Sequence, residues 1–163
     1  MRKSLSIILT LFAFSNVASA QFSQNSKSIG GSVIFDQMYY DHENIGTTLA
    51  VTPSMGYFVK DDIAVTASFS LGAFGDDGVW IVDDASIGVG GKYYYEVDKG
   101  ALYVGDSFEF SRPKALPSMI PEAGYLLGLN KSVFLDFGLE YLMGLGDNKS
   151  STITLEVGIA TFF

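Results

Sequence analysis

The sequence predicts an all-β protein, an eight-stranded antiparallel up-and-down transmembrane β-barrel. Three observations support this prediction. Apolar and polar residues alternate along eight segments, each segment is long enough to cross a bilayer as a tilted strand, and short connections alternate with longer ones. The composition agrees, because 48% of the 163 residues are hydrophobic and 17% are charged, yet no uncharged apolar run after residue 20 could form a spanning helix.

The first twenty residues have the three parts of a secretory signal peptide. Two basic residues follow the initial methionine, an apolar stretch covers residues 5–14, and residues 18–20 form a small-residue cleavage site. This apolar stretch is about half as long as a spanning helix, which needs about 20 residues. We therefore expect a cleaved signal peptide at 1–20 and an exported barrel domain at 21–163, in what we take to be a bacterial protein.

Period-two alternation defines each predicted strand. It is clearest at 133–143, where apolar residues occupy the odd positions and Asp136 and Glu140 fall between them. Residues 63–71 alternate just as regularly, with small or hydroxyl residues on the second face. The eight predicted strands are 28–38, 46–59, 62–72, 84–97, 101–110, 118–129, 132–144 and 151–163.

The connections between these strands are of two kinds. Tight connections are expected at 60–62, 97–100 and 130–131, and looser ones around 41–46, 72–83, 111–117 and 146–150. Short turns on one side and longer loops on the other are typical of outer-membrane barrels. With an even number of strands and a periplasmic N-terminus, the tight turns are periplasmic and both termini lie on the same side.

Closure of the sheet decides which residues face inward. An open sheet in hydrocarbon would leave backbone groups unpaired along both edges, at a cost on the order of several kcal/mol for each group. In a closed barrel the apolar stripe faces lipid and the polar residues face the lumen. Lys92 is the expected basic partner of the inward acids, with luminal water compensating the rest. The predicted structural network comprises Lys92, Glu122, Asp136, Glu140 and Glu156.

The predicted lumen is narrow. Eight strands enclose a space that side chains nearly fill, so we expect no open aqueous channel. Small residues on the inner face would leave room for larger inward neighbours, and these are Gly88, Gly90, Gly124, Gly138 and Gly158.

The fifth predicted strand departs from the alternation. In this strand Asp106 shares a face with four apolar residues, Leu102, Val104, Phe108 and Phe110. A carboxylate on a lipid-facing stripe is unfavourable. We therefore expect a bulge at this point, an exit of the strand into the interface, or a protein partner.

Four tyrosines are predicted to be interfacial aromatics of the outer face, namely Tyr57, Tyr93, Tyr125 and Tyr141. The first three precede predicted periplasmic turns by a few residues, which is where an aromatic girdle lies. Tyr57 and Tyr125 also occupy equivalent places in two similar stretches, 53–59 and 121–127. That similarity indicates either an internal sequence repeat or a chance resemblance between hairpins of like composition.

The chain resembles the small outer-membrane β-barrel domain family of Gram-negative bacteria, including the small porin-family-like barrels. The resemblance covers nearly the whole chain after residue 20. It implies localisation in the cell outer membrane, with outer-membrane lipids, lipopolysaccharide and the barrel-assembly machinery as partners. Ile159 and the terminal Phe163 look like the family's assembly signal, although a hydrophobic final strand of a soluble barrel would read the same way. The residues that carry the resemblance are Pro53, Gly56, Tyr57, Phe58, Val59, Asp61, Asp62, Ala64 and Val65, together with 88–95 and Phe163.

The sequence assigns no catalytic, cofactor-binding or metal-binding residue. Cysteine is absent, so thiolate metal sites and cysteine nucleophiles are excluded. His42 is the only histidine and has no serine at a telling spacing, which favours a solvated loop residue over a catalytic triad. The net charge of −8 and a pI near 4.4 argue against nucleic acid as a partner.

Two features of the expected second external loop have alternative interpretations. Loop acids could bind calcium or simply be solvated, and they are Asp76, Asp77, Asp83 and Asp84. Trp80 could anchor a partner or a glycan, or lie at the outer lipid interface. We favour the solvated loop for the acids and the lipid interface for Trp80.

The functional prediction is an integral outer-membrane barrel with a structural or surface-interaction role, no open pore and no enzymatic activity. Two alternatives remain open: a lipid-modifying outer-membrane enzyme, and a soluble lipocalin-like carrier with its apolar face turned inward around a ligand. The external partner stays unknown at this level.

Overall fold

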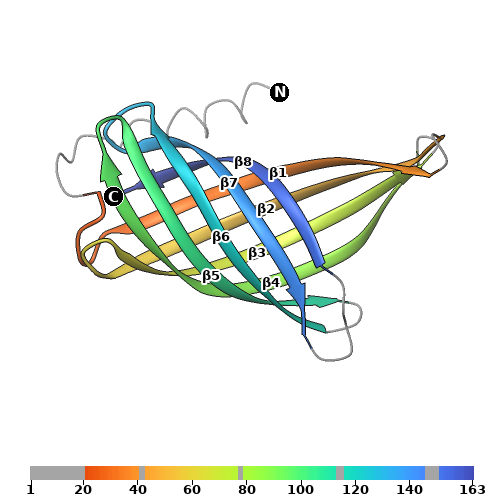
Figure 1. The fold of residues 1–163 in the computed structure, drawn as a ribbon, viewed down its shortest axis with the longest axis horizontal. Coiled ribbons are helices and arrows are strands. Elements are labelled where there is room, and N and C mark those ends of the chain that lie inside the picture. Colours follow the sequence, from red (N-terminus) through yellow and green to blue (C-terminus); the bar gives the residue numbers. More distant parts are fainter. Residues whose placement is uncertain (1–20, 41–42, 77–78, 113–115, 146–150) are drawn as a thin grey trace, which may run out of the picture.

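The computed structural model describes residues 21–163 with gaps at 41–42, 77–78, 113–115 and 146–150. The described chain forms a closed barrel in which each strand pairs with its sequence neighbours and β8 closes on β1 (Figure 1). All eight pairings are antiparallel. The predicted eight-stranded up-and-down barrel is thus confirmed. The predicted signal peptide at 1–20 lies outside the described residues.

Eight strands make up the barrel, and their order follows the sequence. Their bounds are β1 Lys27–Tyr40, β2 Glu43–Lys60, β3 Ile63–Asp76, β4 Val79–Val97, β5 Gly100–Arg112, β6 Leu116–Gly128, β7 Val133–Gly144 and β8 Ser151–Phe162. No helix in the described part of the chain is long and apolar enough to span a bilayer.

One end of the barrel carries the tight connections, and we call it the turn end. It contains the β2–β3, β4–β5 and β6–β7 turns, the segment 21–26 before β1, and the C-terminal Phe163. The β2–β3 turn requires a left-handed residue, and Asp62 supplies it with φ of 64°, a conformation that aspartate tolerates better than most residues. The opposite end, where β1 leads to β2 and β3 leads to β4, is the loop end.

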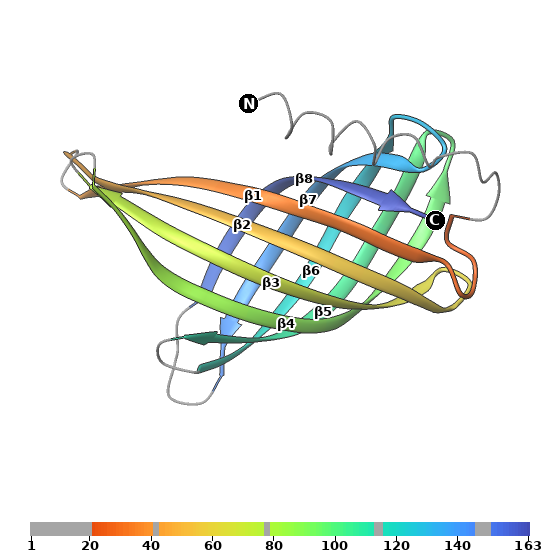
Figure 2. The same ribbon diagram turned by 180° about the vertical axis from the view of Figure 1, so that it is seen from behind.

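The four N-terminal strands extend past the other four at the loop end. Pairing between β1 and β8 covers six residue pairs and stops at Val33 and Val157, and β4 pairs with β5 only from Ala85 onward. Beyond those points β1 to β4 pair among themselves, and both views show them running to a tip beyond the ends of β5 to β8 (Figures 1 and 2). We call this part the extension, comprising 34–40, 43–50, 72–76 and 79–84.

The extension corrects two sequence predictions. Long loops were expected around 41–46 and 72–83, but most of these residues lie in strands. The alternation is interrupted there because the register shifts after Met38 and after Gly72, and such bulges move apolar residues onto the other face. Ile81 and Val82 lie on opposite faces of β4 and are both exposed, so the extension has two open faces.

The outer face of the barrel is apolar. Thirty large apolar side chains are exposed in the described part of the chain, among them Ile29, Val65, Val104, Leu139 and Leu155. The shortest strands have 12 residues, which at a rise of about 3.3 Å and a tilt of about 45° span about 28 Å. This length matches a hydrocarbon core of about 30 Å. The outward apolar belt contradicts the soluble carrier, whose apolar face would line the interior.

Strand β5 is regular at Asp106, so the expected bulge is not present. Its pairing with β4 and with β6 runs through this residue without a register shift. Asp106 therefore stays on the outer face beside Gly91 and Pro121. A bulge is not required because glycine has no side chain to crowd the carboxylate. Within the described residues, Asp106 Oδ1 is buried and has no hydrogen-bond partner.

Candidate functional site

The interior of the barrel has a neutral side formed by β1, β2 and β3, which we call the hydroxyl wall. Alternation places serine and threonine on the inner face of these strands. Thr52 Oγ1 donates a hydrogen bond to Ser70 Oγ at 3.0 Å, so neighbouring hydroxyls partly satisfy one another. The residues of this wall are Ser28, Ser32, Thr52, Ser54, Thr66, Ser68 and Ser70.

The opposite side of the interior, formed by β5 to β8, is acidic. We call it the acidic wall, and its residues are Glu109, Glu122, Asp136, Glu140 and Glu156. The two walls enclose a cavity of about 200 Å³. Lys92 on β4 is the single basic residue among the described residues that line it. The interior therefore carries more negative than positive groups.

Lys92 lies at the border between the two walls. Its Nζ is 2.7 Å from Glu122 Oε2, with side-chain exposures of 18% and 6%. The same ammonium lies 4.5 Å from the centroid of the Tyr103 ring, a cation–π arrangement. Gly105 pairs with Lys92 across β4 and β5, and a Cβ at this glycine would lie 2.9 Å from Lys92 Cγ. The lysine stem thus occupies space that a glycine leaves free.

Tyr103 connects the ion pair to a second carboxylate. Its hydroxyl donates a hydrogen bond to Asp136 Oδ1 at 2.9 Å. The ring lies over Gly124, where an added Cβ would collide with the tyrosine ring and with the Phe137 carbonyl. The structure therefore brings together Lys92, Glu122 and Asp136 of the predicted network, with Tyr103 as a member that the sequence did not suggest.

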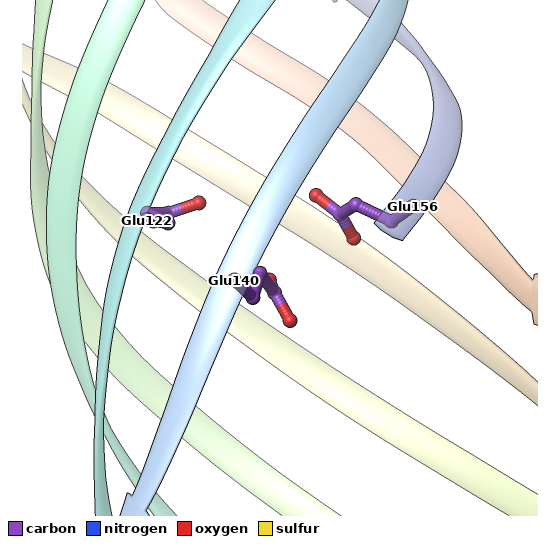
Figure 3. Close-up of side chains that lie close together, drawn as sticks. All are labelled: Glu122, Glu140 and Glu156. Carbon is purple, nitrogen blue, oxygen red and sulfur yellow. The ribbon is translucent and has the colours of Figure 1, made fainter. Parts of the chain in front are cut away.

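Three glutamates from adjacent strands converge in the lumen, and we call them the glutamate cluster. Glu122 on β6 pairs directly with Glu140 on β7, and Glu156 on β8 is paired with Gly138, two residues before Glu140. One carboxylate oxygen from each lies within 4.8 Å of the others, and Figure 3 shows the three side chains close together in the interior. Like charges at directly opposed positions destabilise a sheet, so this arrangement needs compensation.

Two members of the glutamate cluster lack a direct partner. Neither Glu140 nor Glu156 has a hydrogen bond or an ion pair within the part of the chain that the structure describes. Glu156 is also 9% exposed, and its side chain lines the luminal cavity. Gly138 makes room for it, because a Cβ there would lie 2.6 Å from Glu156 Oε1.

The lumen is filled at the turn end by an aromatic plug. Phe22, from the segment before β1, is 3% exposed and lies among four inward rings. Its ring centroid is 5.0 Å from that of Phe162, 5.1 Å from Tyr94, 5.9 Å from Phe58 and 6.1 Å from Phe134. The backbone holds this segment in place, since Asp62 N donates a hydrogen bond to Phe22 O at 2.7 Å.

Sequence reasoning did not identify the plug. The plug residues that lie on strands were identifiable in principle, because alternation places each of these aromatic residues on the inner face close to a predicted turn. Phe22 gave no comparable signal, since it precedes the first predicted strand and has no periodic context. These residues are Phe58, Tyr94, Phe134 and Phe162, with Phe22 added by the N-terminal segment.

The predicted outer-face residues lie where alternation places them. Tyr57, Tyr93 and Tyr125 are on the outer face towards the turn end, and Tyr141 is on the same face towards the loop end. Ile159 and Phe163 are exposed on the last strand and at the C-terminus. Their roles at the lipid interface and in assembly stay predictions.

Most loop residues with predicted roles cannot be placed. Asp84 is exposed at the base of the extension. His42 and Asp77 lie outside the described residues, as do the side chains of Asp76, Trp80 and Asp83.

Neither a protein-family model nor a curated protein matches the sequence, but solved structures match the fold. The N-terminal β-barrel domain of Pseudomonas aeruginosa OprF superimposes with a TM-score of 0.64 and 16% identity, over 86% of this chain and 98% of that chain. The Yersinia pestis outer membrane protein Ail gives 0.58 and 16%, over 86% and 100%. A de novo designed transmembrane β-barrel gives 0.59 and 17%, over 89% and 100%. The chain therefore has the transmembrane β-barrel fold of small outer-membrane proteins.

Proposed function

We propose that the protein is an integral barrel of the cell outer membrane with a structural or surface-interaction role, without an open pore and without enzymatic activity. The observation that carries this proposal is the combination of an apolar outer belt with a lumen that the aromatic plug fills at the turn end. Such a barrel fits a bilayer, and its filled turn end argues against free passage of solutes.

The orientation follows from the two ends of the barrel. Short turns face the periplasm in outer-membrane barrels, and longer extracellular elements face outward. We infer that the turn end is periplasmic and that the extension stands on the cell surface. Its strands β2 and β4 have 18 and 19 residues, more than the bilayer requires, so the extension offers sheet surface beyond the lipid.

Single-cysteine labelling tests this orientation. The chain contains no cysteine, so each introduced thiol is unique. With the full-length protein in a Gram-negative host, Val82→Cys in the extension should react with a membrane-impermeant maleimide on intact cells. Lys99→Cys at the turn end should react only after the outer membrane is permeabilised. Labelling of Lys99→Cys on intact cells, with Val82→Cys protected, would contradict the proposal.

Planar-bilayer recording tests the closed lumen. The wild-type protein should give no steady conductance steps, because the aromatic plug fills the turn end. Phe22→Ala removes the ring that contacts all four strand aromatics and should introduce small steps. A stable ohmic conductance in the wild type would contradict a closed barrel.

The absence of enzymatic activity rests on the lack of any catalytic constellation among the residues that the structure describes. Ser111 Oγ donates a hydrogen bond to the luminal Glu109 at 3.2 Å, but the described residues place no histidine beside this serine to act as its base. Lipid mass spectrometry of a deletion strain should find lipid A and phospholipids unaltered. Loss of a specific modified lipid, restored by the wild-type gene, would instead support the lipid-modifying enzyme.

A further inference from the structure

We propose that the glutamate cluster, Glu122, Glu140 and Glu156, binds one divalent cation inside the barrel, with a preference for Ca²⁺. This inference concerns the lumen and does not depend on what the extension contacts. It goes beyond the sequence prediction, which assigned no metal ligand, because the three residues come from three different strands and converge only in the folded barrel (Figure 3).

The spacing of the carboxylates suits a calcium ion. Each pair of these oxygens lies within 4.8 Å, so a point exists that is no farther than 4.8/√3, or about 2.8 Å, from all three. Ca²⁺ takes oxygen ligands at about 2.3–2.6 Å, so side-chain shifts of a few tenths of an ångström complete the contacts. Mg²⁺ demands a near-ideal octahedron at about 2.0–2.1 Å and gives up its waters reluctantly, whereas Ca²⁺ accepts the irregular geometry of three carboxylates held on three strands.

The charges in the lumen call for a cation at this position. Five carboxylates and one ammonium line the cavity in the described part of the chain, and Lys92 is committed to one oxygen of Glu122. Burial of an uncompensated carboxylate is costly. A doubly charged ion between the three glutamates removes the repulsion that the register imposes on them.

Glu156 is the independent observation that points to a ligand. It is 9% exposed, has neither a hydrogen bond nor an ion pair with any described residue, and points into the cluster (Figure 3). Buried polar groups are otherwise almost always paired. The cavity of about 200 Å³ beside it has space for the several waters that complete the six to eight ligands of calcium.

The predicted consequence is a clamp across β6, β7 and β8. An ion held by one residue on each strand stabilises the folded barrel and has no equivalent site in the unfolded chain, so its binding free energy adds to stability. The hydroxyl wall contributes no charge to this clamp.

Thermal unfolding of the refolded full-chain protein tests the proposal. The protein is placed in vesicles of a zwitterionic lipid, so that lipid headgroups do not attract the ion. Addition of Ca²⁺ to EDTA-treated protein should raise the unfolding midpoint by about 5 °C or more. Mg²⁺ should raise it less, and Na⁺ at equal ionic strength should leave it unchanged. Isothermal titration with Ca²⁺ should give one site per chain.

Neutral variants separate this site from nonspecific binding. Glu140→Gln and Glu156→Gln should each abolish the Ca²⁺ shift and raise the midpoint measured in EDTA, because each removes a repelling charge. A variant that merely folds poorly cannot show such a rise. Glu109→Gln is the matched control, since it neutralises a luminal carboxylate outside the cluster, and it should keep the Ca²⁺ shift.

Three results would overturn the proposal. The first is a wild-type protein whose midpoint and titration show no response to Ca²⁺. The second is an equal Ca²⁺ shift in wild type and in both cluster variants, which would place the ion elsewhere. The third is an equal response to Mg²⁺ and Ca²⁺, which would overturn the calcium preference.

Discussion

The hydroxyl wall and the acidic wall face each other across one cavity, yet different physics holds them together. Serine and threonine satisfy their polar groups pairwise or with water, as the Thr52–Ser70 hydrogen bond does, and impose no charge requirement on their neighbours. The acidic wall depends on groups placed on other strands, namely Lys92, Tyr103 and, in our proposal, a cation. A wall of neutral polar residues therefore tolerates substitution. In a charged wall, the stability of each strand depends on residues of the neighbouring strands.

The largest effect that distinguishes the walls is expected at their border. Lys92→Met keeps the aliphatic stem but leaves Glu122 without its ion-pair partner. We expect a loss of about 2 to 3 kcal/mol in unfolding free energy, below the roughly 3 to 5 kcal/mol of a fully buried pair because luminal water reaches the site. Urea unfolding in lipid vesicles measures it.

The control for this variant is the double substitution Lys92→Met with Glu122→Gln. Removing both charges together should recover much of the lost stability, since no unpaired carboxylate remains. An unchanged unfolding midpoint in Lys92→Met would mean that the lysine does not hold the acidic wall.

A smaller effect is expected from filling the space that the acidic wall needs for Tyr103. In Gly124→Ala the new methyl group meets the tyrosine ring and lies 2.6 Å from the Phe137 carbonyl oxygen. We expect a destabilisation of about 1 to 3 kcal/mol, typical of overpacking. Gly91→Ala is the matched control, because its nearest heavy atom is 3.6 Å away. An equal loss of unfolding free energy in both variants would mean that replacing a strand glycine is itself destabilising, and that contact with the Tyr103 ring is not the cause.

The smallest effect is expected on the hydroxyl wall. Thr52→Val removes one hydrogen bond to Ser70 and keeps the side-chain shape. Because luminal water can replace the lost partner, the cost should be about 1 kcal/mol or less. A loss as large as that of Lys92→Met would erase the distinction between the two walls.

Much of the fold could be predicted from the sequence because strand periodicity is a local signal. The number of strands, their antiparallel order and the inward parity of the five network residues all follow from alternation and from the requirement for closure. The extension could not be predicted in the same way. Bulges after Met38 and Gly72 break the period, and glycine-rich stretches read as loops.

The candidate site depends on information that no single strand contains. Convergence of Glu122, Glu140 and Glu156 depends on the register between three strands, and a shift of one residue would move a carboxylate to the lipid face. Burial of Phe22 depends on how the N-terminal segment folds back across the turn end. Such long-range placements require the closed barrel, so the sequence predicts the members of the network better than their contacts.

The outward direction of the apolar stripe is the claim on which the account depends, and a spin-label scan of β8 in lipid vesicles tests it most directly. Single cysteines at Ile153, Leu155 and Val157 should give labels accessible to lipid-dissolved oxygen, and cysteines at Thr154 and Ala160 should give labels shielded from it. The opposite alternation, or a protein that stays monodisperse in buffer without lipid or detergent, would contradict a transmembrane barrel.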